Sequence, residues 1–90
     1  MLVMIDDVQF NEKDKFYPYI SKAMNLDCDA ITNLDQLYDV FSETKENTEV
    51  IIHDLSNVSD ESKKFALDVT RTLKDADNFN RNITLKFVEN

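Results

Sequence analysis

Three short apolar segments, separated by stretches with helical periodicity, limit what this 90-residue chain can fold into. They are residues 2–5, 50–53 and 83–87. The middle segment is β-branched and apolar, as in a central strand, and the last alternates apolar with polar residues. Strands joined by helical crossovers pair in parallel. The order β-αα-β-α-β therefore predicts an α/β fold, a three-stranded parallel sheet with helices packed on its faces.

Two amphipathic helices are predicted between the first two strands. Asp14 is a candidate N-cap for the first of them. The apolar residues of this helix recur every four positions, at Phe16, Ile20 and Met24. Pro18 is expected in its first turn, where a missing N–H has no partner to lose. Asn25 suits the left-handed position that ends many helices.

The second helix is predicted to begin after Asn33, a good N-cap residue, and Gln36 can reach back to it as in a capping box. At about 100° per residue its apolar residues gather on one arc, the side that packs. They are Leu34, Leu37, Val40 and Phe41.

A different arc of this helix carries Asp35, Asp39 and Ser42, with Tyr38 at its edge, so these side chains should face water or a partner. Two like charges four residues apart destabilise a helix by roughly a few tenths of a kcal/mol. Asp35 is compensated by the positive end of the helix dipole, and Asp39 gains much less. A local cost without visible compensation hints at a binding site on this arc.

The second half of the chain is predicted from caps and turn residues. Residues 43–49 are polar and should form a loop, and residues 54–58 a turn. Ser59 is a candidate cap for a long helix, which the asparagines at 78, 80 and 82 interrupt before the last strand. The buried stripe of this helix is expected at Phe65, Ala66, Val69 and Leu73.

Length and composition predict a single domain spanning residues 1–90, with 42% hydrophobic residues. No apolar run approaches the roughly 20 residues that cross a membrane, and the first seven residues lack the pattern of a signal peptide. The single cysteine, Cys28, cannot form an internal disulfide, which is typical of a reducing compartment. We therefore expect a cytoplasmic protein.

The charge is both negative and uneven. A net charge of −8 argues against nucleic acid or an anionic membrane as a partner. Residues 23–44 contain five acids and no Lys or Arg, hence −5, whereas the remainder has 13 acids and 10 bases, hence −3. Most of the excess charge belongs to the segment that contains the acidic helix, and such a field speeds association with a cationic protein.

Residues suited to catalysis or cofactor binding are few. The chain has no glycine for a phosphate-cradling loop. Its only histidine, His53, ends a strand with no metal-ligand cluster near it in sequence, so we expect no metal or other cofactor. Acid–base catalysis needs a concave pocket and carboxyls in unlike environments, which one exposed helix face does not offer. A carrier domain also fits the size and acidity of the chain, but its helix should begin with a serine that holds the prosthetic group, and this chain has Leu34 at that position. We expect neither enzyme activity nor a small-molecule substrate.

Residues 33–39, Asn-Leu-Asp-Gln-Leu-Tyr-Asp, closely follow the Asn-Leu-Asp-Ala-Leu-Trp-Asp motif of the barstar family, the cytoplasmic inhibitors of barnase-type ribonucleases. The chain resembles this family over residues 2–53 without a gap, and over residues 59–88 in pattern only. The resemblance implies that the acidic helix and its preceding loop enter the active site of a basic ribonuclease. A carboxylate there would take the place of a substrate phosphate.

Carried over by position, Asp39 would be the central phosphate mimic, Asp35 its companion and Tyr38 the aromatic contact in place of the family's Trp. The other expected contact residues are Ser42 on the same helix, Asp29 and Ile31 in the preceding loop, and Asp75 on the long helix as the match for a further family acid.

The chain departs from the family in its aromatic residues. The family usually has aromatic-aromatic-Gly before the motif, where this chain has Ala30-Ile31-Thr32, and residues 42–46 lack a further expected aromatic. The target could therefore be a different basic nuclease, with the chain acting as its immunity protein. A second alternative is an acidic mimic of nucleic acid that binds a nucleic-acid-binding protein, with the binding energy shared among many acids.

Overall fold

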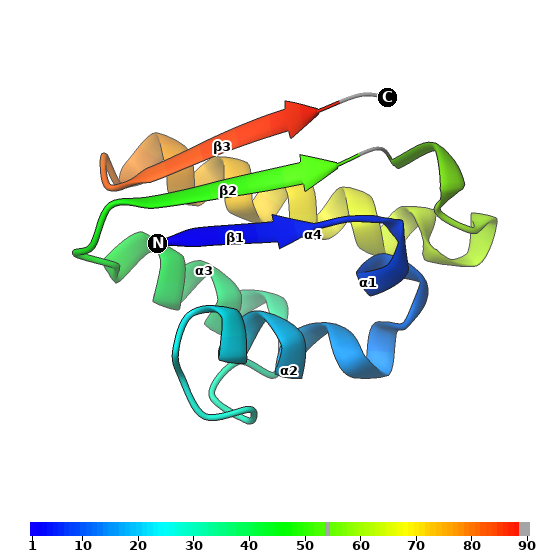
Figure 1. The fold of residues 1–90 in the computed structure, drawn as a ribbon, viewed down its shortest axis with the longest axis horizontal. Coiled ribbons are helices and arrows are strands. Elements are labelled where there is room, and N and C mark those ends of the chain that lie inside the picture. Colours follow the sequence, from blue (N-terminus) through cyan, green and yellow to red (C-terminus); the bar gives the residue numbers. More distant parts are fainter. Residues whose placement is uncertain (54, 89–90) are drawn as a thin grey trace.

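The structure is a computed structural model that describes residues 1–53 and 55–88. Figure 1 shows the elements in chain order. They are β1 (Leu2–Ile5), α1 (Asp7–Asn11), α2 (Lys13–Ala23), α3 (Leu34–Glu43), β2 (Thr48–His53), the short 3-10 helix η1 (Leu55–Asn57), α4 (Asp60–Phe79) and β3 (Ile83–Val88).

The three strands form one parallel sheet in the order β1-β2-β3 (Figure 1). Ile5 of β1 pairs with Ile52 of β2, and Ile52 in turn pairs with Phe87 of β3. The predicted three-stranded parallel sheet and α/β class are confirmed. No helix in the described part of the chain is long and apolar enough to cross a membrane.

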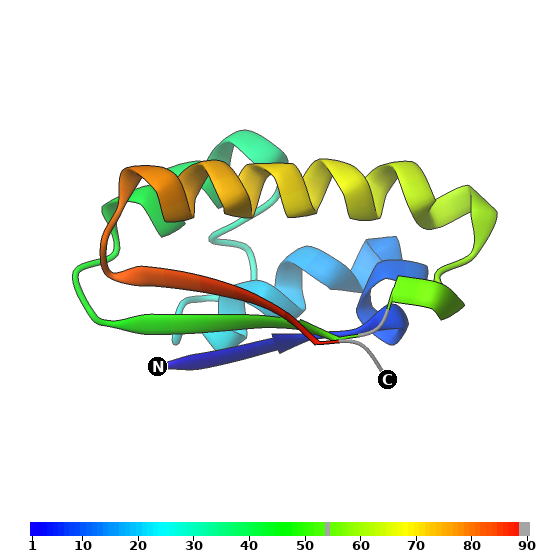
Figure 2. The same ribbon diagram turned by 90° about the horizontal axis from the view of Figure 1, so that it is seen from above.

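Helices α2, α3 and α4 all lie on one side of the sheet (Figure 2). Parallel strands are joined by right-handed crossovers, and the order β1-β2-β3 moves each crossover in the same direction, so their helices share one face. Burial along β1 agrees: Val3 and Ile5 are inaccessible to solvent, whereas Leu2 and Met4 are 55% and 50% exposed. The sequence predicted helices on the faces of the sheet without deciding how many faces they cover.

The core lies between the covered face of the sheet and the helices. One end of it is a group of aromatic rings from α1, α2 and α4. The ring of Phe16 stacks on Phe10 with centroids 5.5 Å apart and meets Phe65 edge to face at 5.1 Å. Leu37 and Phe41 of α3 are fully buried in the same core, which fixes how α3 sits on the sheet.

Two features near the start of the chain differ from the prediction. Helix α1 was not predicted; Asp6 caps it, accepting a hydrogen bond from Val8 N while its own N–H donates to Gln9 Oε1. The N-cap of α2 is Glu12, not Asp14, and Pro18 lies inside α2 instead of in its first turn. Pro18 therefore removes one internal helix hydrogen bond, which the burial of α2 against the core must offset.

The end of α2 follows the prediction, and the start of α4 follows it only in position. Asn25 has φ of 61° after α2, and the N–H of Leu26 donates to Ser21 O at 2.9 Å, as expected for a left-handed helix end. Ser59 occupies the N-cap position of α4, but its side chain makes no capping bond. Its N–H instead donates to Asn11 Oδ1 at 2.8 Å, which ties α1 to the start of α4. Asp54, in the predicted turn, lies outside the described residues.

Candidate functional site

The start of α3 is fixed by side chains that lie just before the helix and in its first turn. Asn33 Oδ1 accepts from Gln36 N at 2.8 Å, so the predicted N-cap is confirmed. Gln36 was predicted to reach back to Asn33, but its Oε1 accepts instead from Thr32, at 2.8 Å from N and 2.6 Å from Oγ1. Together these bonds satisfy the backbone N–H groups of Thr32 and Gln36 and so define the turn that presents Asp35.

Helix α3 is held to the core along its apolar side. Leu37 and Phe41 are fully buried, and Leu34 and Val40 are partly buried against the same cluster. Rotating the helix would expose these side chains, and burying one large apolar side chain contributes about 1.5–3 kcal/mol. The opposite face is therefore kept pointing outward.

Asp35 and Asp39 occupy this outward face one turn apart, and both are exposed. Their Cα atoms are separated by about 6 Å along the helix axis, from the rise per residue. Among the described residues, neither carboxylate makes an ion pair or a side-chain hydrogen bond. The two predicted phosphate mimics therefore present negative charges to solvent, and no cationic side chain among the described residues pairs with either.

Ser42 and Tyr38 flank the two carboxylates. Ser42 is partly buried, and its hydroxyl donates to Asp39 O at 3.2 Å, so the helix itself already uses that donor. Tyr38 is also partly buried, and its ring centroid lies 6.5 Å from that of Phe79, with the ring planes tilted by 49°. Tyr38 thus joins the outward face of α3 to the end of α4.

The C-terminal end of α3 is anchored by asparagines that follow α4. Asn80 Nδ2 donates to Phe41 O at 2.9 Å and to Thr44 O at 2.8 Å. Asn82 Nδ2 adds a bond to Thr44 O at 3.2 Å. The sequence predicted only that these asparagines end α4. In the structure, their side chains donate to carbonyls at the end of α3, which have no hydrogen-bond partner within the helix.

Helix α4 brings Asp75 and Phe79 to the same region. Helices α3 and α4 run in the same direction (Figures 1 and 2), and Asp75 lies one turn before Phe79, whose ring is near that of Tyr38 on α3. Asp75 is exposed and makes no ion pair within the described residues. Its exposed carboxylate therefore lies one helical turn from Phe79, and its role as a contact residue stays a prediction.

Phe79 is 71% exposed and was not predicted as a site residue. The spacing of residues along α4 could have indicated that Phe79 is exposed. Phe79 continues the polar row Asp68, Thr72, Asp75 at helical spacing. An aromatic residue in such a row points away from the core.

Of the two contact residues predicted in the connector before α3, one is exposed and the other is buried. Asp29 is exposed and, with Cys28, lines a groove of 360 Å³ between this connector and α2. Ile31 was predicted to contact a partner, but it is fully buried, and its N–H donates to the buried Ser21 Oγ at 3.1 Å. The Ile31 side chain packs in the core at the base of this groove, so it is not the exposed contact that was predicted.

Tyr17 forms another part of this groove and has a perturbed acidity. Burial raises the pKa of the Tyr17 hydroxyl, and the negative charge of Asp68 raises that pKa further. Tyr17 therefore stays neutral to higher pH than a free tyrosine. It offers the groove a hydroxyl and an aromatic edge, but no charge at physiological pH.

The remaining reactive side chains stay apart. Cys28 is a free, exposed thiol in the connector, whereas His53 ends β2 and follows Glu49 and Ile51 on the uncovered face of the sheet. Across residues 1–53 and 55–88, no group of three His, Cys, Asp or Glu residues is placed to hold a metal ion.

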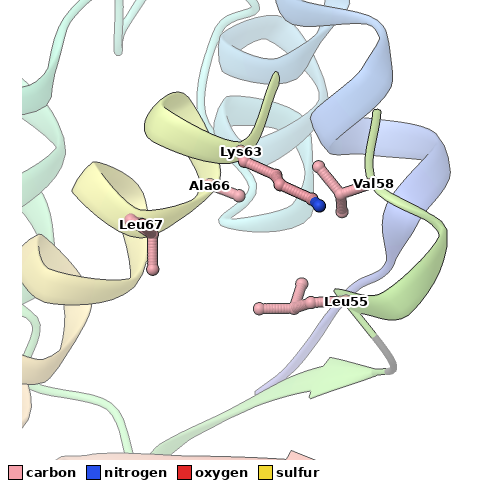
Figure 3. A pocket seen from close by; sticks show the side chains of 5 residues that line it. All are labelled: Leu55, Val58, Lys63, Ala66 and Leu67. Atoms are coloured by element: carbon pink, nitrogen blue, oxygen red, sulfur yellow. The ribbon is translucent and has the colours of Figure 1, made fainter. Parts of the chain in front are cut away.

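A separate apolar hollow of 210 Å³ lies near the start of α4 and η1 (Figure 3). Its lining is Leu55, Val58, Lys63, Ala66 and Leu67. Lys63 is the one ionisable side chain in this lining, and its Nζ pairs with Asp60 at 3.0 Å. The hollow is more than two helical turns from the Tyr38–Phe79 contact and contributes nothing to the acidic surface.

No family model matches this chain, and no curated protein matches it. The likeness to barstar thus depends on the residues of α3 and on the order of the elements.

Proposed function

We propose that this chain is a barstar-like protein inhibitor of a bacterial basic ribonuclease of the barnase type. It acts in the cytoplasm by covering the nuclease's active site with α3, and it catalyses no reaction itself. Asp39 takes the position of a substrate phosphate, Asp35 pairs with a neighbouring cation, and Asp29 and Asp75 extend the negative surface on either side.

The observation that carries this proposal is the pair of exposed, unpaired carboxylates on a helix held at both ends. Burying a carboxylate in an interface is favourable only when fixed cations replace its water. Ribonuclease active sites supply such cations, because they bind phosphates. Asp35 and Asp39 have no competing cation of their own among the described residues.

The rigidity of α3 supports the same function. Asn33 and Gln36 define its first turn, and Asn80 binds its last carbonyls. A preordered helix loses little conformational entropy on binding, so more of the interaction energy appears as affinity. An interface burying roughly 800 Å² on each side would be typical for such a complex.

The test is inhibition of RNA hydrolysis by a panel of purified barnase-type ribonucleases. For a nuclease that the chain inhibits, Asp39→Asn should weaken the complex by at least about 30-fold, as expected for removing one partner of a buried charge pair. Asp60→Asn is the matched control: it changes the net charge equally, its side chain is 95% exposed, and it lies at the far end of α4.

Each outcome has a defined meaning. If no member of the panel is inhibited, the assignment to barnase-type ribonucleases is wrong. If inhibition occurs and the two variants lose affinity equally, the phosphate-mimic mechanism is wrong. A loss spread evenly over all surface acids would instead favour a general mimic of nucleic acid.

A further inference from the structure

Phe79 is the most exposed large hydrophobic side chain in the described part of the structure, at 71%. Its nearest aromatic neighbour is Tyr38 on α3, with ring centroids 6.5 Å apart. The other aromatic contacts, which involve Phe10, Phe16, Tyr17 and Phe65, lie within a separate cluster. The Tyr38–Phe79 pair therefore forms its own aromatic surface, with contributions from two helices.

Acidic residues border this surface. On α3, Asp35 lies one turn before Tyr38, and Asp39 follows it directly. On α4, Asp75 lies one turn before Phe79. None of the three carboxylates makes an ion pair among the described residues.

An aromatic face bordered by free carboxylates suits one kind of side chain in particular. Arginine has a planar, weakly hydrated guanidinium that stacks on aromatic rings and pairs with carboxylates in a bidentate fork. Lysine is a compact, strongly hydrated point charge and gains less from the ring faces. A second copy of this chain would bring three carboxylates against three, which like-charge repulsion opposes.

We propose that the Tyr38–Phe79 surface binds an arginine side chain of the target nuclease, and that the surrounding carboxylates pair with its guanidinium. This inference rests on the proposed inhibitory function and names a contact that this function does not require. It makes Phe79 a binding residue, although Phe79 belongs to neither α3 nor the connector before it.

The test measures binding of Phe79 variants to a barnase-type ribonuclease that wild-type protein inhibits, with the nuclease inactivated at its catalytic base. Phe79→Ala should raise Kd about 30-fold, the size typical of an aromatic hot spot, mainly through faster dissociation. Phe79→Leu should lose nearly as much affinity, because leucine is apolar but has no ring on which a guanidinium can stack. Phe79→Tyr should bind within threefold of wild type.

Leu67→Ala is the matched control. Leu67 is 60% exposed on the same helix, three helical turns from Phe79, and should change Kd less than twofold. Urea unfolding of each variant checks that it is folded under the binding conditions. If Phe79→Ala and Leu67→Ala have the same effect, or if Phe79→Leu binds like wild type, the stacking assignment is overturned.

A double-mutant cycle identifies the partner residue. Each arginine near the nuclease's active site is replaced by lysine and combined with Phe79→Ala. One of these arginines should couple with Phe79 by about threefold or more. No coupling at any arginine overturns the proposal.

Failure of this inference and failure of the proposed function give different results. If Asp39→Asn weakens the complex and Phe79→Ala does not, the inhibitory function stands and the arginine contact is wrong. If Phe79→Ala instead abolishes self-association in sedimentation experiments, the surface is a contact between copies, which also overturns the proposal.

Discussion

Asn80 connects the segment between α4 and β3 to the end of α3 through two hydrogen bonds and makes a third within that segment, and Asn80→Ala removes all three. Its Nδ2 group donates to Phe41 O and Thr44 O at 2.9 and 2.8 Å, and its Oδ1 accepts from Asn82 N at 3.0 Å. The backbone at Asn80, with φ of −118° and ψ of 114°, is one that alanine adopts freely. The substitution therefore reports on the side-chain bonds and not on backbone strain.

The expected loss follows from these three bonds. A protein hydrogen bond contributes about 1 kcal/mol to stability, so we expect the free energy of unfolding to fall by about 3 kcal/mol. Thr44 O keeps a bond from Asn82 Nδ2 at 3.2 Å, which limits the penalty for an unsatisfied carbonyl. Small domains are stable by about 5–15 kcal/mol, so the variant should still fold.

Urea unfolding followed by circular dichroism measures this loss. With a slope of about 1 kcal/mol per molar urea for a small domain, the midpoint should fall by about 3 M. Asn78→Ala is the matched control, because Asn78 is exposed and makes no side-chain hydrogen bond among the described residues. If the two variants unfold within about 0.5 M of each other, Asn80 does not anchor α3 as described.

Three further predictions concern stability. Within the part of the chain that the structure describes, Thr70 Oγ1 is buried without a hydrogen-bond partner, so Thr70→Val should leave the free energy of unfolding unchanged or raise it by up to about 1 kcal/mol. Thr72→Val loses a bond to Asp68 O and should not stabilise the protein, and thermal unfolding compares the two variants. Asn33→Ala should cost about 1 kcal/mol through loss of the α3 cap, and an unchanged urea midpoint would refute this. Burial, and secondarily Asp68, raise the folded-state pKa of Tyr17 above the ordinary 10.0, so folding favours the protonated form. Its contribution should be complete below pH 10 and be lost as pH rises through the folded-state pKa, a loss that Tyr17→Phe should remove in pH-dependent urea titrations.

Local sequence patterns predicted several elements and failed where a competing local signal was stronger. The spacing of Phe16, Ile20 and Met24 correctly predicted a buried stripe on α2. Asp14 resembled a cap, yet α2 begins at Lys13 with Glu12 as its N-cap. Helix α1 was missed because its capping box uses Asp6 and Gln9 over only five helical residues, too few for a periodic pattern.

For the predicted contact surface too, local patterns placed the residues within a helix but not those in a connector. Asp35, Asp39 and Tyr38 could be assigned to the outward side because helical periodicity relates residues three and four apart. Ile31 could not be placed, because it is buried in the core by packing against other segments, and its N–H bonds to Ser21 Oγ, ten residues earlier. No local pattern indicates which way a connector residue turns.

By itself, the sequence determined the order of the strands and of the helices α2, α3 and α4, the N-cap of α3 and the face that carries Asp35 and Asp39, but it missed the short helices α1 and η1. These features depend on residues within a turn or two of each other, where backbone geometry and side-chain spacing suffice. Only the tertiary structure decided that the helices share one side of the sheet, that Asn80 binds the end of α3 and that Phe79 lies against Tyr38. Those contacts join distant segments, and packing on a common sheet brings them together.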